Sequence, residues 1–75
     1  MRITLEQIKE DHTILDAMKS QCVRIWSGEH EAYWRPEAYG YTPDGLEAGV
    51  WWFEDAWYRT KHCGPEKKIE FRTAS

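Results

Sequence analysis

Aromatic residues are concentrated in one stretch of this chain, Tyr33 to Tyr58, which reads YWRPEAYGYTPDGLEAGVWWFEDAWY. It holds nine of the eleven aromatic residues, interspersed with three glycines and two prolines. A small domain needs a few large side chains for its core, yet here Trp51, Trp52 and Phe53 stand in a row beside several tyrosines. This excess predicts either an aromatic surface built for contact or an oligomer that buries it.

The length of 75 residues limits the chain to one domain, residues 1–75. A domain of this size buries roughly 60% of the surface that its unfolded chain exposes, so its core is marginal. Large aromatic side chains offset this in part, because each can bury about 150–250 Å². Homo-oligomerisation is the other common remedy, and the excess of aromatic residues favours it.

The net charge of -3 argues against binding to extended nucleic acid, which requires a basic surface that displaces counterions from phosphates. Basic residues do cluster between Arg59 and Arg72, but Glu66 and Glu70 dilute them, which indicates a solvated face. No apolar run approaches the about 20 residues that span a bilayer, and no signal peptide is expected. The two cysteines lack paired spacing, which favours a reduced, cytoplasmic protein.

The N-terminal part of the chain predicts a helix over residues 5–20, followed by a β-hairpin. Thr4 is placed to cap this helix, and Gln7 completes a capping box. His12 falls within the apolar stripe of the helix and is expected to be a packed edge residue rather than a ligand. Residues 22–26 alternate as a strand does, 27–30 form a turn, and 31–35 return as a second strand that Pro36 ends.

The C-terminal part predicts a loop, a short strand, a helix and a final strand. The loop covers residues 36–49 and contains a turn signal at Pro43-Asp44-Gly45. A short strand over 50–52 precedes a second helix over 54–63, which Gly64-Pro65 ends. Residues 68–72 alternate as a strand. The order predicts an α+β fold, in which a small antiparallel or mixed sheet (the β-hairpin plus the C-terminal strand) is covered by two helices.

The middle of the chain resembles a group of small bacteriophage and prophage accessory proteins. The segments that carry the resemblance are Ser27-Gly28-Glu29-His30, Tyr33-Trp34-Arg35-Pro36, Gly40-Tyr41-Thr42, Ala48-Gly49-Val50-Trp51 and Glu54-Asp55-Ala56. They cover residues 25–56, under half of the chain. The resemblance implies a viral or mobile-element origin and action inside a bacterial host, and it implies no established reaction.

Two positions depart from the pattern of these phage proteins. The group usually carries asparagine after the proline, where this chain has Glu37. It also favours Ser or Thr as a helix N-cap ahead of the acidic pair, where this chain has Trp52. Loss of a capping hydroxyl costs roughly 1 kcal/mol, so either Trp52 is recruited for contact or the helix begins elsewhere.

The loop that combines glycines with aromatic residues is the candidate ligand site. Its N–H groups can hold an anion, Arg35 and the hydroxyl groups can contact phosphate or ribose, and a tryptophan can stack on a base. The predicted ligand-binding residues are Trp34, Arg35, Gly40, Tyr41, Thr42, Gly49 and Trp51. The simpler alternative is that the glycines serve turns and the tryptophans serve the core, because the loop lacks the spacing of any phosphate loop.

A patch of Trp, Tyr and Arg is the candidate protein interface, because these residue types dominate binding hot spots. It consists of Trp52, Trp57, Tyr58 and Arg59, and self-association through the same patch is an equal alternative. The histidines and cysteines lack the close pairing of zinc ligands, so neither a metal site nor a cofactor is expected. No residue stands out as catalytic, so no enzymatic activity is expected.

Together these features predict a phage-derived, non-enzymatic binding protein that acts against host defence in the cytoplasm of its bacterial host. The first hypothesis is a small nucleotide-like ligand held in the loop of glycines and aromatic residues, in a homo-oligomer. The alternative is a protein–protein inhibitor of a host immune complex. Neither a membrane nor extended nucleic acid is expected as a partner.

Overall fold

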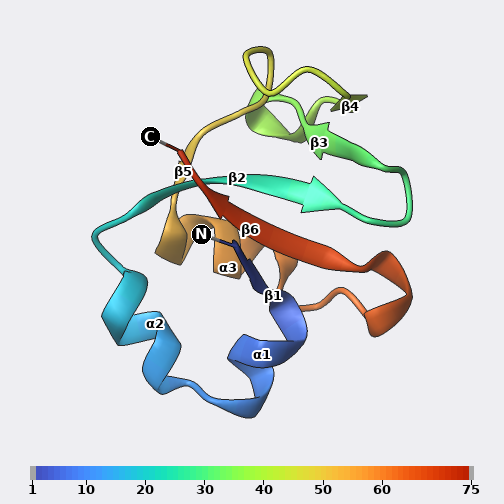
Figure 1. Cartoon of the computed structure of the whole chain (residues 1–75). Coiled ribbons are helices and arrows are strands. Elements are labelled where there is room, and N and C mark those ends of the chain that lie inside the picture. Colours follow the sequence, from blue (N-terminus) through green and yellow to red (C-terminus); the bar gives the residue numbers. More distant parts are fainter. Residues whose placement is uncertain (1, 75) are drawn as a thin grey trace.

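A single antiparallel sheet, with its helices against one face, organises the computed structural model, which describes residues 2–74 (Figure 1). Met1 and Ser75 of the predicted domain lie outside the described residues. The strands are β1 (Arg2–Thr4), β2 (Cys22–Ser27), β3 (Ala32–Trp34), β4 (Tyr41–Thr42), β5 (Trp51–Trp52) and β6 (Ile69–Thr73). Their order is β1-β6-β2-β3-β4, and β5 pairs with the start of β2. The predicted α+β fold, with its β-hairpin and C-terminal strand, is confirmed.

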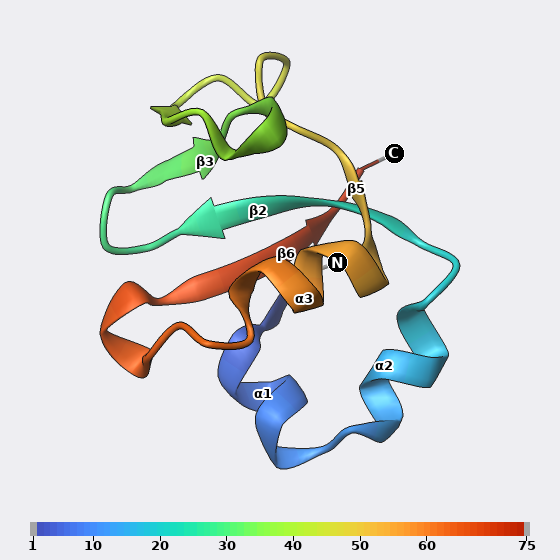
Figure 2. The ribbon, with the colours of Figure 1, turned by 180° about the vertical axis from the view of Figure 1, so that it is seen from behind.

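Strands β2 and β6 lie side by side in the middle of the sheet, and their side chains point alternately to its two faces. Val23, Ile25 and Phe71 are buried almost completely, and they alternate with partly exposed neighbours. Because successive side chains of a strand point to opposite faces, these buried apolar residues lie together on the face toward the helices, whereas Trp26 lies on the other face with Arg24. The opposite face is free of helices (Figures 1 and 2).

The described chain has three α-helices rather than the predicted two. They are α1 (Leu5–Glu10), α2 (Thr13–Met18) and α3 (Phe53–Thr60), with short 3₁₀ helices at Pro36–Ala38 (η1) and Pro65–Lys67 (η2). Helices α1 and α3 pack against the sheet, and α2 packs mainly against α1 and α3. None of the helices within residues 2–74 is both long and apolar enough to cross a bilayer.

The prediction of one continuous helix over residues 5–20 is wrong, because the chain turns at Asp11. The predicted capping box at Thr4 and Gln7 does begin α1, with both of its hydrogen bonds present. The Asp11 N–H ends α1 by donating to the carbonyl groups of Gln7 and Ile8. The Asp11 carboxylate then accepts hydrogen bonds from the hydroxyl and N–H of Thr13, the first residue of α2, and these bonds lower the pKa of Asp11.

Helix α3 lies against the apolar face of the sheet (Figure 2). Phe53 packs edge-on against Phe71 of β6 with ring centroids 5.3 Å apart, and both rings are buried. Thr60 is also buried, and its hydroxyl donates to the Ala56 carbonyl at 2.7 Å. The helix ends at Thr60, three residues before the predicted end at residue 63.

The segment between β3 and β5 contains more regular structure than the predicted loop. Tyr41 and Thr42 form β4, which pairs with Tyr33 and Trp34. The predicted turn follows at Asp44, whose carboxylate accepts the Leu46 N–H at 2.8 Å. The segment is therefore a small extension of the sheet, and its turn is held by an aspartate side chain.

Two adjacent residues of this segment adopt a left-handed backbone. Glu37 has φ 59° and Ala38 has φ 62°. This conformation costs an L-residue roughly 1–2 kcal/mol, and asparagine tolerates it better than glutamate does. Glu37 therefore carries backbone strain that an asparagine at this position would reduce.

Replacing Ala38 with glycine is expected to raise the free energy of unfolding by about 1 kcal/mol, because glycine adopts positive φ without a steric penalty. The matched control is Ala17→Gly, since Ala17 is also exposed but lies within α2. There the same change should lower the free energy by about 0.5–1 kcal/mol. Urea unfolding followed by circular dichroism measures both, and a loss of stability in Ala38→Gly would contradict the strain.

Candidate functional site

The predicted ligand-binding residues lie close together, because β3, β4 and the turn at 44–47 fold onto one another. The Arg35 N–H donates to the Gly40 carbonyl at 2.9 Å, and this bond closes the loop between the two strands. The Gly49 N–H donates to the Trp34 carbonyl at 2.9 Å and brings the start of β5 beside β3. A side chain at position 49 would collide with the Trp51 ring and the Pro36 backbone, so glycine is required there.

The polar groups of this loop are used mainly within the loop itself. Thr42 is fully buried, and its hydroxyl donates to the Glu47 carboxylate and accepts the Asp44 N–H. Arg35 donates to the Tyr41 carbonyl at 3.1 Å and pairs with Glu47 at 3.7 Å. These contacts indicate that Arg35 and Thr42 stabilise the loop rather than bind a ligand. The side-chain groups that were expected to contact a phosphate already have hydrogen-bond or ion-pair partners.

The aromatic residues of the loop are partly covered. Trp34 and Trp51 meet edge to face, with centroids 6.5 Å apart, and both pack against the hydrophobic core. Tyr41 stacks on His30 at 4.1 Å. The Trp34 indole N–H is buried and has no hydrogen-bond partner among residues 2–74.

A small hollow lies beside this loop. It measures about 100 Å³ and is lined by Trp34, Ala38, Gly40 and Tyr41. Small-molecule sites usually enclose about 300–1,000 Å³. The hollow is therefore smaller than a nucleotide requires, although three of the predicted ligand-binding residues line it.

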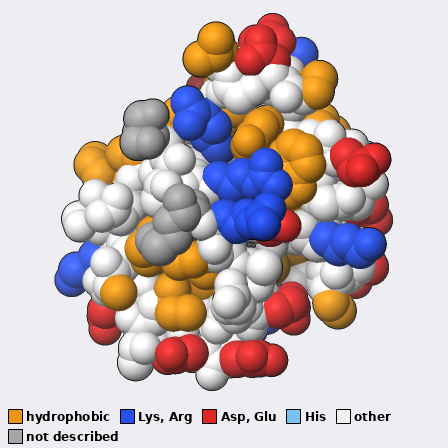
Figure 3. All heavy atoms as spheres, in the orientation of Figure 1, with side chains coloured by type: hydrophobic (Ala, Val, Ile, Leu, Met, Phe, Trp, Pro, Cys, Tyr) orange, Lys and Arg blue, Asp and Glu red, His pale blue; other side chains and the backbone are white. Residues whose placement is uncertain are grey.

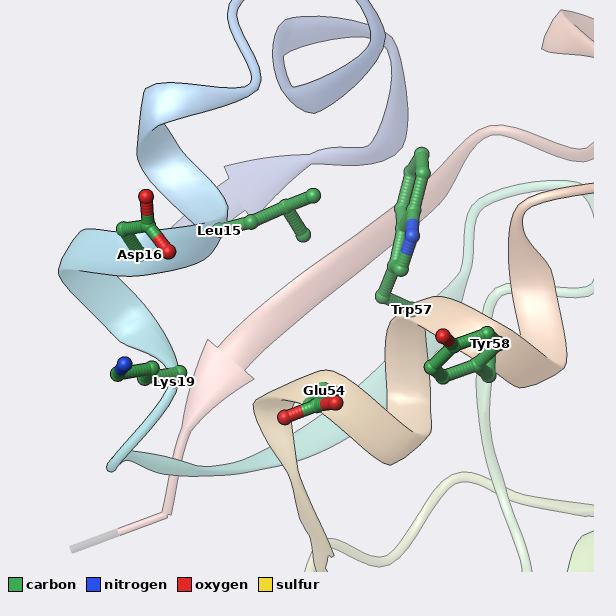
Figure 4. Close-up of a pocket in the computed structure, with 6 residues that line it drawn as sticks. All are labelled: Leu15, Asp16, Lys19, Glu54, Trp57 and Tyr58. Atoms are coloured by element: carbon green, nitrogen blue, oxygen red, sulfur yellow. The ribbon is translucent and has the colours of Figure 1, made fainter.

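A larger groove lies between α2 and α3 (Figure 4). Its volume is about 340 Å³, and its lining residues are Leu15, Asp16, Lys19, Glu54, Trp57 and Tyr58. Leu15 points from α2 toward the Trp57 ring of α3, while Lys19 and Glu54 lie farther along the groove. The groove thus offers apolar contact between the helices and charges of both signs beside it.

Two of the four predicted interface residues line this groove. Trp57 is half-buried and meets the His12 ring edge-on at 6.0 Å, whereas Tyr58 is 59% exposed and carries the Lys61 ammonium 4.5 Å from its ring centroid. Trp52 and Arg59 are exposed but do not line the groove. They are seven residues apart, which places them on the same side of α3.

The sequence reasoning missed the groove because it missed the turn at Asp11. In one continuous helix over residues 5–20, the apolar stripe that contains His12 also contains Leu15, and Asp16 and Lys19 face solvent. The signal that would have found the turn is the Asp-x-Thr step at Asp11, since an aspartate two residues before a threonine can start a new helix.

The histidines, cysteines and carboxylates of the described chain are the side chains that a metal site or an activated nucleophile would require. Among residues 2–74, no three His, Cys, Asp or Glu side chains form a group that could hold a metal ion. Burial raises the pKa of the Cys63 thiol, whereas an activated nucleophile needs a lowered one. Glu29 and His30 form an exposed pair at 3.3 Å, within the hairpin turn and away from the groove.

Comparison with known proteins returns no match to the chain among protein-family models, curated proteins or solved structures. The resemblance to phage accessory proteins therefore stays a prediction, as do the function and the host compartment.

Trp52 occupies the capping position of α3. Its backbone has the extended conformation of an N-cap (φ −60°, ψ 143°), but no side chain caps the helix, and the ring is 56% exposed. The helix begins at Phe53, one residue before the predicted start at residue 54, and Trp52 is its N-cap residue. The absence of a capping hydroxyl at position 52 therefore costs stability.

Trp52→Ser is expected to be more stable than Trp52→Ala by about 1 kcal/mol, because the serine hydroxyl caps α3 whereas alanine does not. Both variants remove the same ring, so the difference between their free energies of unfolding isolates the cap. Equal urea midpoints in the two variants would show that position 52 does not cap the helix.

Proposed function

We propose that this protein is a non-catalytic binding protein that engages a partner protein through the groove between α2 and α3. The observation that carries the proposal is the groove itself, with Trp57 and Tyr58 on one wall. A partner inserts an apolar side chain between Leu15 and Trp57. Binding to a partner protein is the alternative function that the sequence analysis raised, and the proposal assigns it to this groove.

The relative sizes of the groove and of the hollow beside the predicted ligand-binding loop favour a protein partner over a nucleotide. The groove is about 340 Å³, whereas the hollow beside the loop is about 100 Å³. Arg35 and Thr42 already have partners within the loop, so a phosphate there would have to displace Glu47 from both side chains.

The chemistry of the groove matches that of binding hot spots. Tryptophan and tyrosine dominate such sites because they bury a large area with few rotatable bonds. Trp57 is already held by His12 and by its helix, so little side-chain entropy is lost when a partner covers it. Asp16 and Glu54 outnumber Lys19 along the groove, which favours a partner whose apolar anchor lies beside a basic residue.

The proposed setting is the cytoplasm of a bacterial host. The resemblance to phage accessory proteins supports this setting, and it makes a host defence protein the proposed partner. In such a role the protein acts by occupying a surface, and it needs no reactive group of its own.

Tyr58→Ala is expected to reduce capture of the host partner by at least about tenfold, the loss that truncation of an interface hot spot typically causes. Wild type, Tyr58→Ala and Tyr39→Ala are immobilised, exposed to a lysate of the bacterial host, and compared by quantitative mass spectrometry. Tyr39 is the matched control, because it is 78% exposed, follows η1 and does not line the groove.

The proposal requires one host protein that wild type and Tyr39→Ala retain and Tyr58→Ala loses. Equal recovery by all three proteins would contradict it. Native mass spectrometry of the same samples distinguishes partner binding from self-association. If wild type is a dimer and Tyr58→Ala is a monomer, the groove is an interface between two copies of this chain.

A further inference from the structure

Three arginines stand side by side on the face of the sheet that no helix covers. Arg2 of β1 is paired directly with Arg72 of β6, and Arg72 is paired directly with Arg24 of β2. Residues in direct register share a face, and neighbouring strands are about 4.8 Å apart. The three side chains therefore form a row across the strands, which we call the arginine row, and Figure 3 shows basic side chains gathered at the centre of this face.

This arrangement works against folding. Like charges directly opposite each other on neighbouring strands are destabilising. Glu70 is the acidic residue that offsets them, with oxygen–nitrogen distances of 3.3 Å to Arg72 and 3.9 Å to Arg2. One carboxylate against three guanidinium groups leaves an excess of positive charge on this face.

The middle member of the row is rigidly held. The Arg72 guanidinium lies over the Trp26 ring, 4.1 Å from its centroid, and it donates to the Tyr33 hydroxyl at 3.2 Å. Burial alone would lower the pKa of Arg72, but the hydrogen bonds to Tyr33 and Glu70 outweigh it and raise the pKa above its ordinary value. Arg72 therefore stays charged, in one fixed orientation.

The two outer members keep donors available. Arg24 uses its Nε to donate to the Gly45 carbonyl at 2.9 Å, and its terminal nitrogens have no hydrogen bond within residues 2–74. The Arg2 side chain is 65% exposed, and among residues 2–74 its ion pair is the long contact with Glu70. Donors thus flank the fixed guanidinium on both sides.

We infer that the arginine row binds a short polyphosphate chain, free or as part of a nucleotide. Guanidinium groups bind phosphate oxygens through paired hydrogen bonds. Successive phosphoryl groups are joined by one bridging oxygen, so their negative charges lie close together. Neighbouring arginines can therefore bind the same short chain. Side chains on one face of an extended acidic peptide repeat at about 6.8 Å, which is longer than the steps of about 4.8 Å in the row.

The aromatic residues beside the arginine row contact Arg72, so they are not available to stack on a nucleotide base. Arg72 covers the Trp26 ring, and the Tyr33 ring meets Trp26 edge-on at 4.9 Å. A base would have to displace Arg72 to stack on Trp26, so the phosphates provide the affinity. Tripolyphosphate and ATP are therefore expected to bind alike, and adenosine is not expected to bind.

Isothermal titration calorimetry at low salt tests the inference, with tripolyphosphate, ATP, adenosine, hexaglutamate and a twelve-residue oligothymidylate as probes. Arg2→Gln and Arg24→Gln should each weaken binding of tripolyphosphate by at least about tenfold, since each removes a charge-assisted pair of hydrogen bonds. Arg59→Gln is the matched control, because Arg59 is exposed on α3 and away from the sheet. It should bind as wild type does.

A second measurement excludes a merely structural role for Arg2. Without ligand, Arg2→Gln should unfold at a higher urea concentration than wild type, because repulsion within the row is relieved. With tripolyphosphate at saturation for wild type, the order should reverse. The inference is overturned if wild type does not bind tripolyphosphate, if Arg2→Gln and Arg24→Gln both bind it as wild type does, or if hexaglutamate or the oligothymidylate binds more tightly.

Discussion

The five-residue pairing between β2 and β6 is the interaction on which both faces of this protein depend. Its register places Ile25 opposite Phe71 on the face that α3 covers. The same register places Arg24 opposite Arg72 on the other face, which no helix of residues 2–74 covers and which we call the open face. A slip of one residue would turn Phe71 out of the core and would dismantle the arginine row in the same step. The hydrophobic core and the surface charge are therefore consequences of one strand pairing.

Three local features lower the stability of a fold that has little core to offset them. They are the left-handed backbone at Glu37 and Ala38, the uncapped start of α3 at Trp52, and the arginine row. Each breaks a local rule that the rest of the chain obeys, as the capping box of α1 illustrates. Departures of this kind are expected where contact with another molecule, rather than folding, determines the residue. All three lie at the surface of the molecule.

The elements that the sequence predicts well are those with a long pattern of their own. The alternation in residues 22–26 and 68–72 identified β2 and β6, and the acidic start and Gly64-Pro65 end located α3 within a few residues. Strands β1 and β4 have three and two residues, too few for a pattern, and they exist because a neighbouring strand offers hydrogen bonds. The turn at Asp11 was missed because apolar periodicity continues through it.

The two proposed binding surfaces were harder to predict than the fold, for different reasons. The groove depends on the turn at Asp11, so a local error hid a surface that Trp57 and Tyr58 already indicated. The arginine row depends on register alone, since positions 2, 24 and 72 are distant in the sequence. No local pattern reports which arginines become neighbours across a sheet. The predicted ligand-binding residues do lie close together, yet the hydrogen bonds of Thr42 and Arg35 hold the loop itself together.

Net charge is a poor guide to what the open face binds. Screening in physiological salt limits charge interactions to about 8 Å, whereas the molecule measures 30 × 26 × 19 Å. Acidic side chains on the far side therefore have little influence on the arginine row. A long nucleic acid would extend past the row and meet the carboxylates of the turn at 44–47, whose Gly45 carbonyl contacts Arg24. A short polyanion confined to the row would meet fewer of these carboxylates, so the length of an anion matters here as well as its sign.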